Sequence, residues 1–127
     1  MLFRSKLSEA ETEFRRMLEI CQKLVAGNPN VPRFRSYEAT CRDALSSVLR
    51  HLGRPAEARD ACERAIAILE APVQQEPKET EYSSQLALSY RRSALARGDL
   101  GDHPGAAADA RRAMAVLEGL SSRTGEA

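Results

Sequence analysis

Apolar side chains recur every three or four residues along most of the chain, and short segments containing glycine and proline interrupt this pattern. Such spacing places the apolar side chains on one face of an α-helix. The pattern predicts a leading helix at residues 8–26, a helix pair at 32–75, a second pair at 80–120 and a frayed tail at 121–127. We therefore expect an all-α chain of five antiparallel helices that forms one domain over residues 1–127.

Local signals at the segment boundaries predict where individual helices begin and end. Ser8 and Glu11 form an S-x-x-E pattern, in which the two side chains satisfy free amides at a helix start. Gly27 is expected to end the leading helix in the left-handed conformation. Pro72 is expected to end or kink the third helix, because a mid-helix proline lacks an N–H and clashes with the preceding turn. Asp102 is a suitable N-cap for the last helix.

The whole pattern returns after 48 residues, so that Leu52 and Gly53 correspond to Leu100 and Gly101. Further sets that match at this spacing are Ala10, Ala58 and Ala106; Arg16, Arg64 and Arg112; Leu18, Ile66 and Met114; and Ile20, Ile68 and Val116. A fixed period of this length indicates stacked helical units rather than one globular core. The chain then consists of half a unit followed by two full helix pairs.

The composition narrows the classes of function. Aromatic residues form 5% of the chain, tryptophan is absent and the formal net charge is +1, which disfavours nucleic-acid binding. No apolar run approaches the length of a membrane span, and the first residues show no signal-peptide pattern. Cys21, Cys41 and Cys62 lack CxxC spacing and lie in helical patterns. We therefore expect a reduced, cytoplasmic chain without a nucleic-acid or membrane partner.

The segment 52–70, LGRPAEARDACERAIAILE, resembles the turn and second helix of a tetratricopeptide repeat. Gly53 stands in the turn, and Ala58 and Ala65 stand at the small positions where the two helices approach closely. Cys62 takes the usual aromatic position. The resemblance implies an antiparallel helix-pair solenoid that acts as a protein–protein interaction scaffold, with a protein or peptide partner.

The family's usual unit has about 34 residues, whereas the unit of this chain has 48. The added residues lengthen the helices and the turn around residues 28–32. This long form, with its LVAGNPNVPRFR turn and HLGRPAEA start, resembles the repeat arrays that follow bacterial serine/threonine kinase domains, notably in planctomycetes. The resemblance implies a bacterial source and leaves a regulatory segment of a larger kinase-type protein as an alternative function.

In this family the first helix of each unit lines the concave surface. The resemblance therefore assigns eight candidate peptide-binding residues, which are Thr40, Asp43, Ser47, Arg50, Leu88, Arg91, Arg92 and Leu95. Leu88 and Leu95, flanked by arginines, suit an extended or helical peptide that carries an apolar anchor and an acid. The family's chaperone-tail clamp is not expected, because Ser47 and Leu95 stand where it needs asparagine. The alternative is that Leu88 and Leu95 pack against neighbouring helices.

The second helix pair departs from the first at positions that should face the core. Leu45 and Leu49 of the first unit correspond to Ser93 and Arg97 of the second. The second unit should therefore be more polar inside. Either its helices pack loosely, or Arg97 pairs with an acid.

No residue pattern predicts catalysis, a cofactor or a metal ion. Cys41, His51 and Cys62 match no metal-ligand spacing, and His103 lies beside an inter-helix turn. A nucleophile formed by Cys62 and His51 is disfavoured, because Cys62 lies on an apolar stripe where a thiol is inert. We expect a protein that is not an enzyme.

The two ends of the predicted solenoid lack covering helices. Phe14, Met17 and Leu18 of the leading helix should lose part of their cover, and exposure of such side chains costs about 1.5–3 kcal/mol each. The last helix likewise has no polar capping helix after it. Either the chain is a segment of a longer array, or the uncapped helices pair with a second copy. Self-association into a homo-oligomer is thus the other alternative function.

Overall fold

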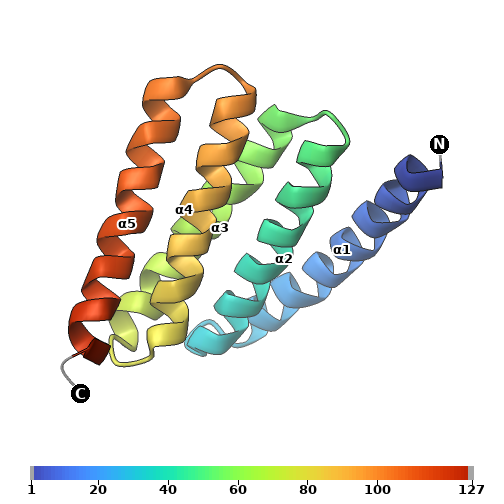
Figure 1. Cartoon of the computed structure of the whole chain (residues 1–127). Helices are drawn as coiled ribbons and strands as arrows, with labels where there is room; N and C mark the ends of the chain where they lie inside the picture. The colour runs from blue at the N-terminus through green and yellow to red at the C-terminus, as the bar shows by residue number, and fades with distance from the viewer. Residues whose placement is uncertain (1, 126–127) are drawn as a thin grey trace.

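The computed structural model describes residues 2–125 and forms five α-helices, without a β-strand among these residues. The helices are α1 (Leu2–Gly27), α2 (Pro32–His51), α3 (Pro55–Gln75), α4 (Thr80–Asp99) and α5 (His103–Gly125). Consecutive helices run antiparallel and pack side by side (Figure 1). The fold is the all-α helix-pair solenoid that the sequence predicts.

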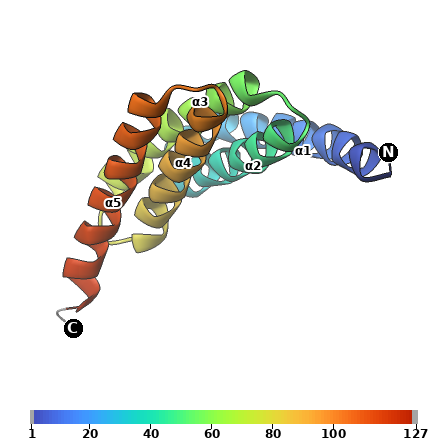
Figure 2. The same ribbon diagram turned by 45° about the horizontal axis from the view of Figure 1, so that its top comes forward.

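The five helices form an arch with α2 and α4 on its inner side (Figure 2). The backbones of α2 and α4 approach each other directly, whereas within residues 2–125 the backbone of the outer helix α3 approaches neither α1 nor α5. Because the inner helices approach each other more closely than the outer helices, the stack curves toward α2 and α4. The concave surface is therefore formed by the first helix of each pair.

Glycine ends the first helix of each pair in the left-handed conformation. Gly53 has a φ of 78° and Gly101 has a φ of 81°, a region that residues with a Cβ rarely adopt. In both turns the amide after the glycine donates to the carbonyl five residues back at 2.9 Å, which completes a Schellman motif. At the start of α5, the Gly105 amide donates to Asp102 Oδ1 at 3.0 Å, so the predicted Asp102 cap is confirmed.

The start of α1 corrects the predicted capping pair. The helix begins at residue 2 rather than at residue 8, so Ser8 lies inside it. The Ser8 carbonyl accepts a bond from Thr12 Oγ1 at 3.2 Å, and Glu11 pairs with Arg54 at 2.8 Å. The leucine, arginine and lysine residues before Ser8 favour helix, so the helix extends past the local capping signal.

The end of α1 also differs from the prediction, because Gly27 does not adopt the left-handed conformation. The Asn28 side-chain amide donates to the Leu24 carbonyl at 3.0 Å. This bond satisfies one of the carbonyls that a helix end leaves free. The Asn28 side chain therefore caps the end of α1, as the left-handed glycines Gly53 and Gly101 cap the ends of α2 and α4.

Pro72 neither ends nor visibly interrupts α3, which continues to Gln75. Pro72 and Leu69 are both fully buried, and this burial stabilises the last turns despite the missing amide of the proline. Residues 121–125 of the predicted frayed tail lie in α5, which runs to Gly125. The rest of that tail, residues 126–127, lies outside the described residues.

The first helix pair packs through small and aliphatic side chains. Ala39, Ala65 and Leu69 are fully buried, and Leu86 of α4 packs against them. A second cluster consists of Leu45, Leu49, Ala58 and Ala96. Alanines at these positions let the helix axes approach closely, as the resemblance implies.

The second pair has the polar interior that the sequence predicts. Ser93 and Asp109 are buried, and Ser93 Oγ donates to Asp109 Oδ2 at 2.6 Å. Arg97 bridges three acids: Asp109 at 3.0 Å, Asp102 at 3.1 Å and Glu63 of α3 at 2.5 Å. The prediction that Arg97 pairs with an acid is confirmed. Arg97 thereby joins α3, α4 and α5.

The uncovered ends of the solenoid are only partly as predicted. Met17 is 49% exposed on α1, whereas Leu18 is buried. Phe14 is partly buried and packs against the Leu45–Leu49 cluster. α2 covers these two side chains because they lie on the side of α1 that faces the stack. The exposed large apolar residues of α1 are Leu2, Phe3, Met17 and Ile20.

Candidate peptide-binding site on the concave surface

Four of the predicted site residues lie on α2, and three of them are engaged by α4. The contacts are Thr40 with Gln85, Asp43 with Ser89 at 2.7 Å and Arg50 with Asp99 at 2.5 Å. These side chains join the two inner helices of the arch. They are therefore part of the interface between the two helix pairs rather than of an open groove.

Asp43 is the most buried member of the predicted set, at 4% exposure. Its Oδ2 accepts the bond from Ser89, but its Oδ1 has no hydrogen-bond partner among residues 2–125. Burial raises the pKa of Asp43 to about 6, although the Ser89 bond and the positive charge of Arg92 oppose this shift. The carboxyl group is thus a buried, titratable contact between α2 and α4.

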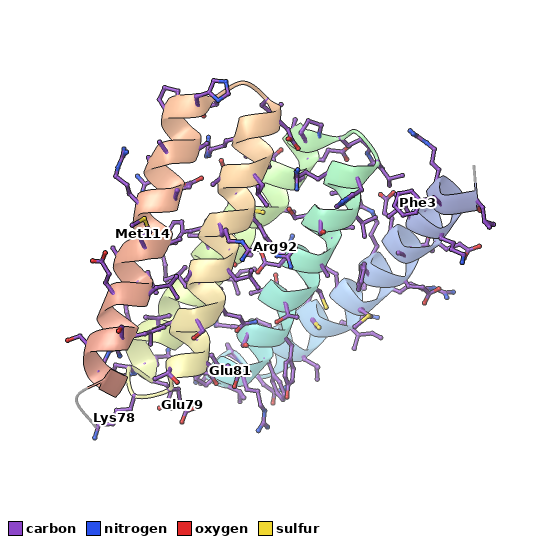
Figure 3. All side chains as sticks on the ribbon, viewed as in Figure 1. Phe3, Lys78, Glu79, Glu81, Arg92 and Met114 are labelled. Carbon is purple, nitrogen blue, oxygen red and sulfur yellow. The ribbon has the colours of Figure 1, made fainter. Side chains whose placement is uncertain are left out.

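Four other predicted residues surround a cavity between α2 and α4. This arginine cavity has a volume of about 170 Å³ and is lined by Ser46, Ser47, Arg50, Arg91, Arg92 and Leu95. Arg92 lies on α4 near the middle of the inner face (Figure 3). The structure therefore brings Ser47, Arg91, Arg92 and Leu95 together, with Arg50 beside them.

The arginine cavity has unused hydrogen-bond donors. Arg92 Nε is buried and has no partner within the described part of the chain. Arg91 is exposed and makes no hydrogen bond or ion pair with another described residue. Leu95 is 44% exposed at the edge of the cavity. A guanidinium offers only donors, so these groups suit a carboxylate beside an apolar side chain.

Leu88, the remaining predicted residue, lies outside the arginine cavity. Together with Arg91 it lines a separate cavity of about 170 Å³ between α4 and α5. Arg91 therefore stands on the ridge between the two cavities. The structure separates Leu88 from Leu95, which the sequence had placed on one stripe.

A third cavity was missed by the sequence reasoning. It has a volume of about 390 Å³ and is lined by Met17, Cys21, Ser36, Tyr37, Thr40, Cys41 and Glu81. It lies where α1, α2 and the first turn of α4 meet, near Glu81 in Figure 3. The signal that points to it is Tyr37, an aromatic side chain 46% exposed on the helix predicted to line the concave surface.

The cysteine and histidine residues do not form a nucleophilic site. Cys62 is buried and lies 2.9 Å from Ser46 Oγ, and burial raises the pKa of its thiol to about 12. His51 is exposed and its Nδ1 contacts the Ser47 carbonyl at 2.8 Å. Residues 2–125 contain no cluster of three His, Cys, Asp or Glu residues suited to a metal ion. None of the helices in that range is long and apolar enough to cross a membrane.

Residues 39–71 match the family model of the tetratricopeptide repeat. The matched segment runs through most of α2 and α3, including the turn at Gly53. It supports a tetratricopeptide-type repeat at the first helix pair, and repeats of this type generally mediate protein–protein interaction. No curated protein and no solved structure matches the chain.

Proposed function

With a tetratricopeptide-type repeat at residues 39–71 as the premise, we propose that this chain is a non-enzymatic scaffold that binds a protein or peptide segment on its concave surface. The observation that carries the proposal is the arginine cavity between α2 and α4, with Leu95 exposed at its edge. The bound segment presents an acidic side chain to the arginines and an apolar side chain to Leu95.

The charge of the cavity supports an acidic partner. Arg50 is already neutralised by Asp99, whereas Arg91 has no acidic partner among the described residues. Arg92 lies close enough to Asp43 for their charges to interact, but its Nε is left without a hydrogen bond. A buried donor without an acceptor costs about 1–3 kcal/mol, so a carboxylate that reaches Arg92 gains this energy on binding.

The size of the cavity supports a side chain rather than a cofactor. Its volume of about 170 Å³ is below the roughly 300–1,000 Å³ of typical small-molecule sites. An acidic side chain fits such a space, while the rest of the partner lies along α2 and α4. This size also agrees with a scaffold that does no chemistry on its ligand.

We predict that peptides are captured only when they carry both a leucine and an acidic residue. A peptide array that varies these two residues tests this, with parallel peptides in which leucine becomes serine or the acid becomes lysine. The variant R91E/L95D should lose capture, because it repels the acid and removes the apolar anchor. Circular dichroism should remain helical, since both side chains are exposed.

The matched control is R16E/I20D on α1. Arg16 and Ile20 have similar chemistry and the same four-residue spacing as Arg91 and Leu95, and both are exposed on α1, which contributes no residue to the arginine cavity. This control should bind the array as the unchanged chain does. Capture that is equally strong for acidic and basic peptides, or that survives R91E/L95D, contradicts the proposal.

Self-association is a second candidate function, favoured by the apolar residues on α1. Phe3 is 67% exposed and Ile20 is 60% exposed. Full burial of such side chains contributes about 1.5–3 kcal/mol each. Pairing of two α1 helices across these side chains would therefore stabilise a dimer without using the concave surface.

We predict that, if α1 mediates self-association, light scattering gives a mass that rises with concentration into the high micromolar range. The variant F3S/I20S should then remain a monomer, because it removes both apolar contacts. The variant R91E/L95D serves as the control and should associate as the unchanged chain does. A monomer at every concentration excludes this second function and leaves the concave-surface proposal untouched.

The 48-residue unit also supports a proposal about the protein to which the chain belongs. We propose that the chain comes from a bacterial, cytoplasmic protein and is a regulatory repeat segment of a larger kinase-type protein. The support is the resemblance of the long turn at residues 28–32 to arrays that follow kinase domains. Sequencing the surrounding gene tests this directly, since a neighbouring kinase domain or further 48-residue units would be found there.

A further inference from the structure

The way α4 packs on the first helix pair provides an internal template. Gln85 Nε2 donates to the Ser36 carbonyl at 3.1 Å, and Ser36 Oγ donates to Gln85 Oε1 at 2.5 Å. One turn later, Ser89 Oγ donates to Asp43 Oδ2 at 2.7 Å. Between these contacts, Leu86 packs against the cluster of Ala39, Ala65 and Leu69. α4 thus occupies the groove between α2 and α3.

The same groove recurs at the end of the solenoid, where no helix of the described chain fills it. A shift of 48 residues carries its lining from α2 and α3 to Ser84, Ala87, Leu88 and Arg91 of α4 and to Ala113 and Leu117 of α5. These six residues are the ones that line the cavity of about 170 Å³ between α4 and α5. We call this lining, together with Met114 and Arg111, the end surface.

The end surface exposes the apolar side chains that α4 covers in the first unit. Leu69 is fully buried, but its counterpart Leu117 is 52% exposed. Met114 is 58% exposed on the outermost helix (Figure 3), whereas its counterpart Ile66 is half-buried. The end surface therefore has the shape and the apolar character of an occupied helix groove, without its helix.

Two charge reversals distinguish the end surface from the template. Asp43, which accepts the bond from Ser89, becomes Arg91. Glu63, which pairs with Arg97 at 2.5 Å, becomes Arg111. Both changes replace an acid by a base at a position that contacts the packed helix. A helix that packs here needs acceptors where α4 carries Ser89 and Arg97, and carboxylates supply them best.

A third difference determines which residue of a packed helix should be apolar. Thr40, which contacts Gln85 in the template, becomes Leu88 on the end surface. A leucine at the glutamine position of a packed helix therefore contacts Leu88, in place of the bonds that Gln85 forms with Ser36, whose counterpart is Ser84. A helix that packs on the end surface should therefore carry two adjacent apolar residues. One acid follows four residues after the first apolar residue, and a second acid follows eight residues after the first acid.

We infer that the end surface is the docking site for one amphipathic α-helix of a partner protein, which packs as α4 packs on α2 and α3 and carries two acids opposite Arg91 and Arg111. This interaction is separate from the concave-surface proposal. It uses the opposite side of Arg91, and its apolar contacts are with Leu88, Met114 and Leu117 rather than with Leu95.

A peptide made from the chain's own α4 tests the inference. The native peptide has the sequence of residues 79–101, and the acidic peptide carries in addition Q85L, S89D and R97E. The unchanged protein should bind the acidic peptide about tenfold or more tightly than the native peptide, because two like-charge or unsatisfied contacts become ion pairs. Fluorescence polarisation at two salt concentrations measures the affinities, and salt should weaken the acidic peptide most.

The charge-swap variant R91D/R111E gives the decisive comparison. It restores the acids of the template at both positions, so it should reverse the preference and bind the native peptide more tightly. L117D should abolish binding of the acidic peptide, whereas L95D, which alters the arginine cavity, should leave it unchanged. All the substituted protein side chains are exposed, and circular dichroism verifies that the fold is retained.

Equal affinity for the two peptides, or a preference that R91D/R111E does not reverse, overturns the inference. Binding that L95D abolishes and L117D spares also overturns it and places the acidic peptide in the concave site instead. A dimer that L117D dissociates and the acidic peptide does not displace shows that a second copy occupies the end surface, which again overturns it. Because Arg91 borders both cavities, the single variants L95D and L117D, rather than R91E/L95D, separate this inference from the concave-surface proposal. A further 48-residue unit in the same gene whose first helix packs on the end surface also overturns the inference.

Discussion

Replacing Arg97 with leucine should lower the free energy of unfolding by about 1.5–3 kcal/mol, the usual contribution of hydrogen bonds to a charged group. Arg97 Nε lies 3.0 Å from Asp109 Oδ2, and Asp109 is only 5% exposed. In the variant Ser93 still donates to Asp109 Oδ2 and Arg112 Nη1 still lies 3.1 Å from Asp109 Oδ1, but the contact between Arg97 and Asp109 Oδ2 is lost. Urea unfolding followed by circular dichroism measures the change.

The first helix pair supplies the control for this experiment. The residues that correspond to Ser93, Arg97 and Asp109 at the 48-residue spacing are Leu45, Leu49 and Ala61. The triple variant S93L/R97L/D109A therefore recreates the apolar interior of the first unit. It should regain most of the stability that R97L loses, because it also removes the buried carboxylate that R97L leaves with fewer partners. R97L that unfolds at the same urea concentration as the unchanged chain contradicts this role of Arg97.

Replacing Asp43 with asparagine should stabilise the fold at neutral pH by roughly 2–3 kcal/mol. Burial raises the pKa of Asp43 to about 6 in the folded chain, against about 3.9 when unfolded. Between these two values the folded state holds a proton that the unfolded state releases. The stability contributed by this carboxyl group is therefore fully present below about pH 4 and is lost as the pH rises through about 6.

The pH dependence separates this effect from a general change in packing. The difference in unfolding free energy between D43N and the unchanged chain should be small near pH 4, grow up to pH 6–7 and then stay constant. D60N is the control, because Asp60 is an exposed carboxylate and its removal should leave the curve nearly unchanged. A difference between D43N and the unchanged chain that does not vary with pH contradicts a raised pKa for Asp43.

The features that the sequence predicted correctly are those that depend on near neighbours along the chain. The number of helices, their pairing and the helix ends at Gly53 and Gly101 follow from local periodicity and from the freedom of glycine. The left-handed end predicted at Gly27 is absent, because the Asn28 side chain caps α1 instead. The predictions also failed at Ser8 and Pro72. At those positions, helix propagation and burial against other helices outweighed a local capping or breaking signal.

At the candidate site, the sequence did not predict which residues other helices would cover. The sequence predicted that Thr40 and Asp43 belong to the peptide-binding site together with Leu88 and Arg91, because these residues occupy equal positions in consecutive units. In the folded chain α4 engages the first two, whereas Arg91 stays exposed between two cavities. The pairing of Arg97 with an acid was predicted, but its three partners on α3, on α5 and in the turn before α5 were not.

The sequence by itself determined that this protein is a stack of helix pairs with a concave inner surface. Only the tertiary structure decided which of the repeated positions are covered and which are open. The physical reason is that the residues of one repeat do not determine whether another helix packs against it. A helix inside the stack is packed on both sides, and the same helix at the end of the stack presents one of those sides to solvent.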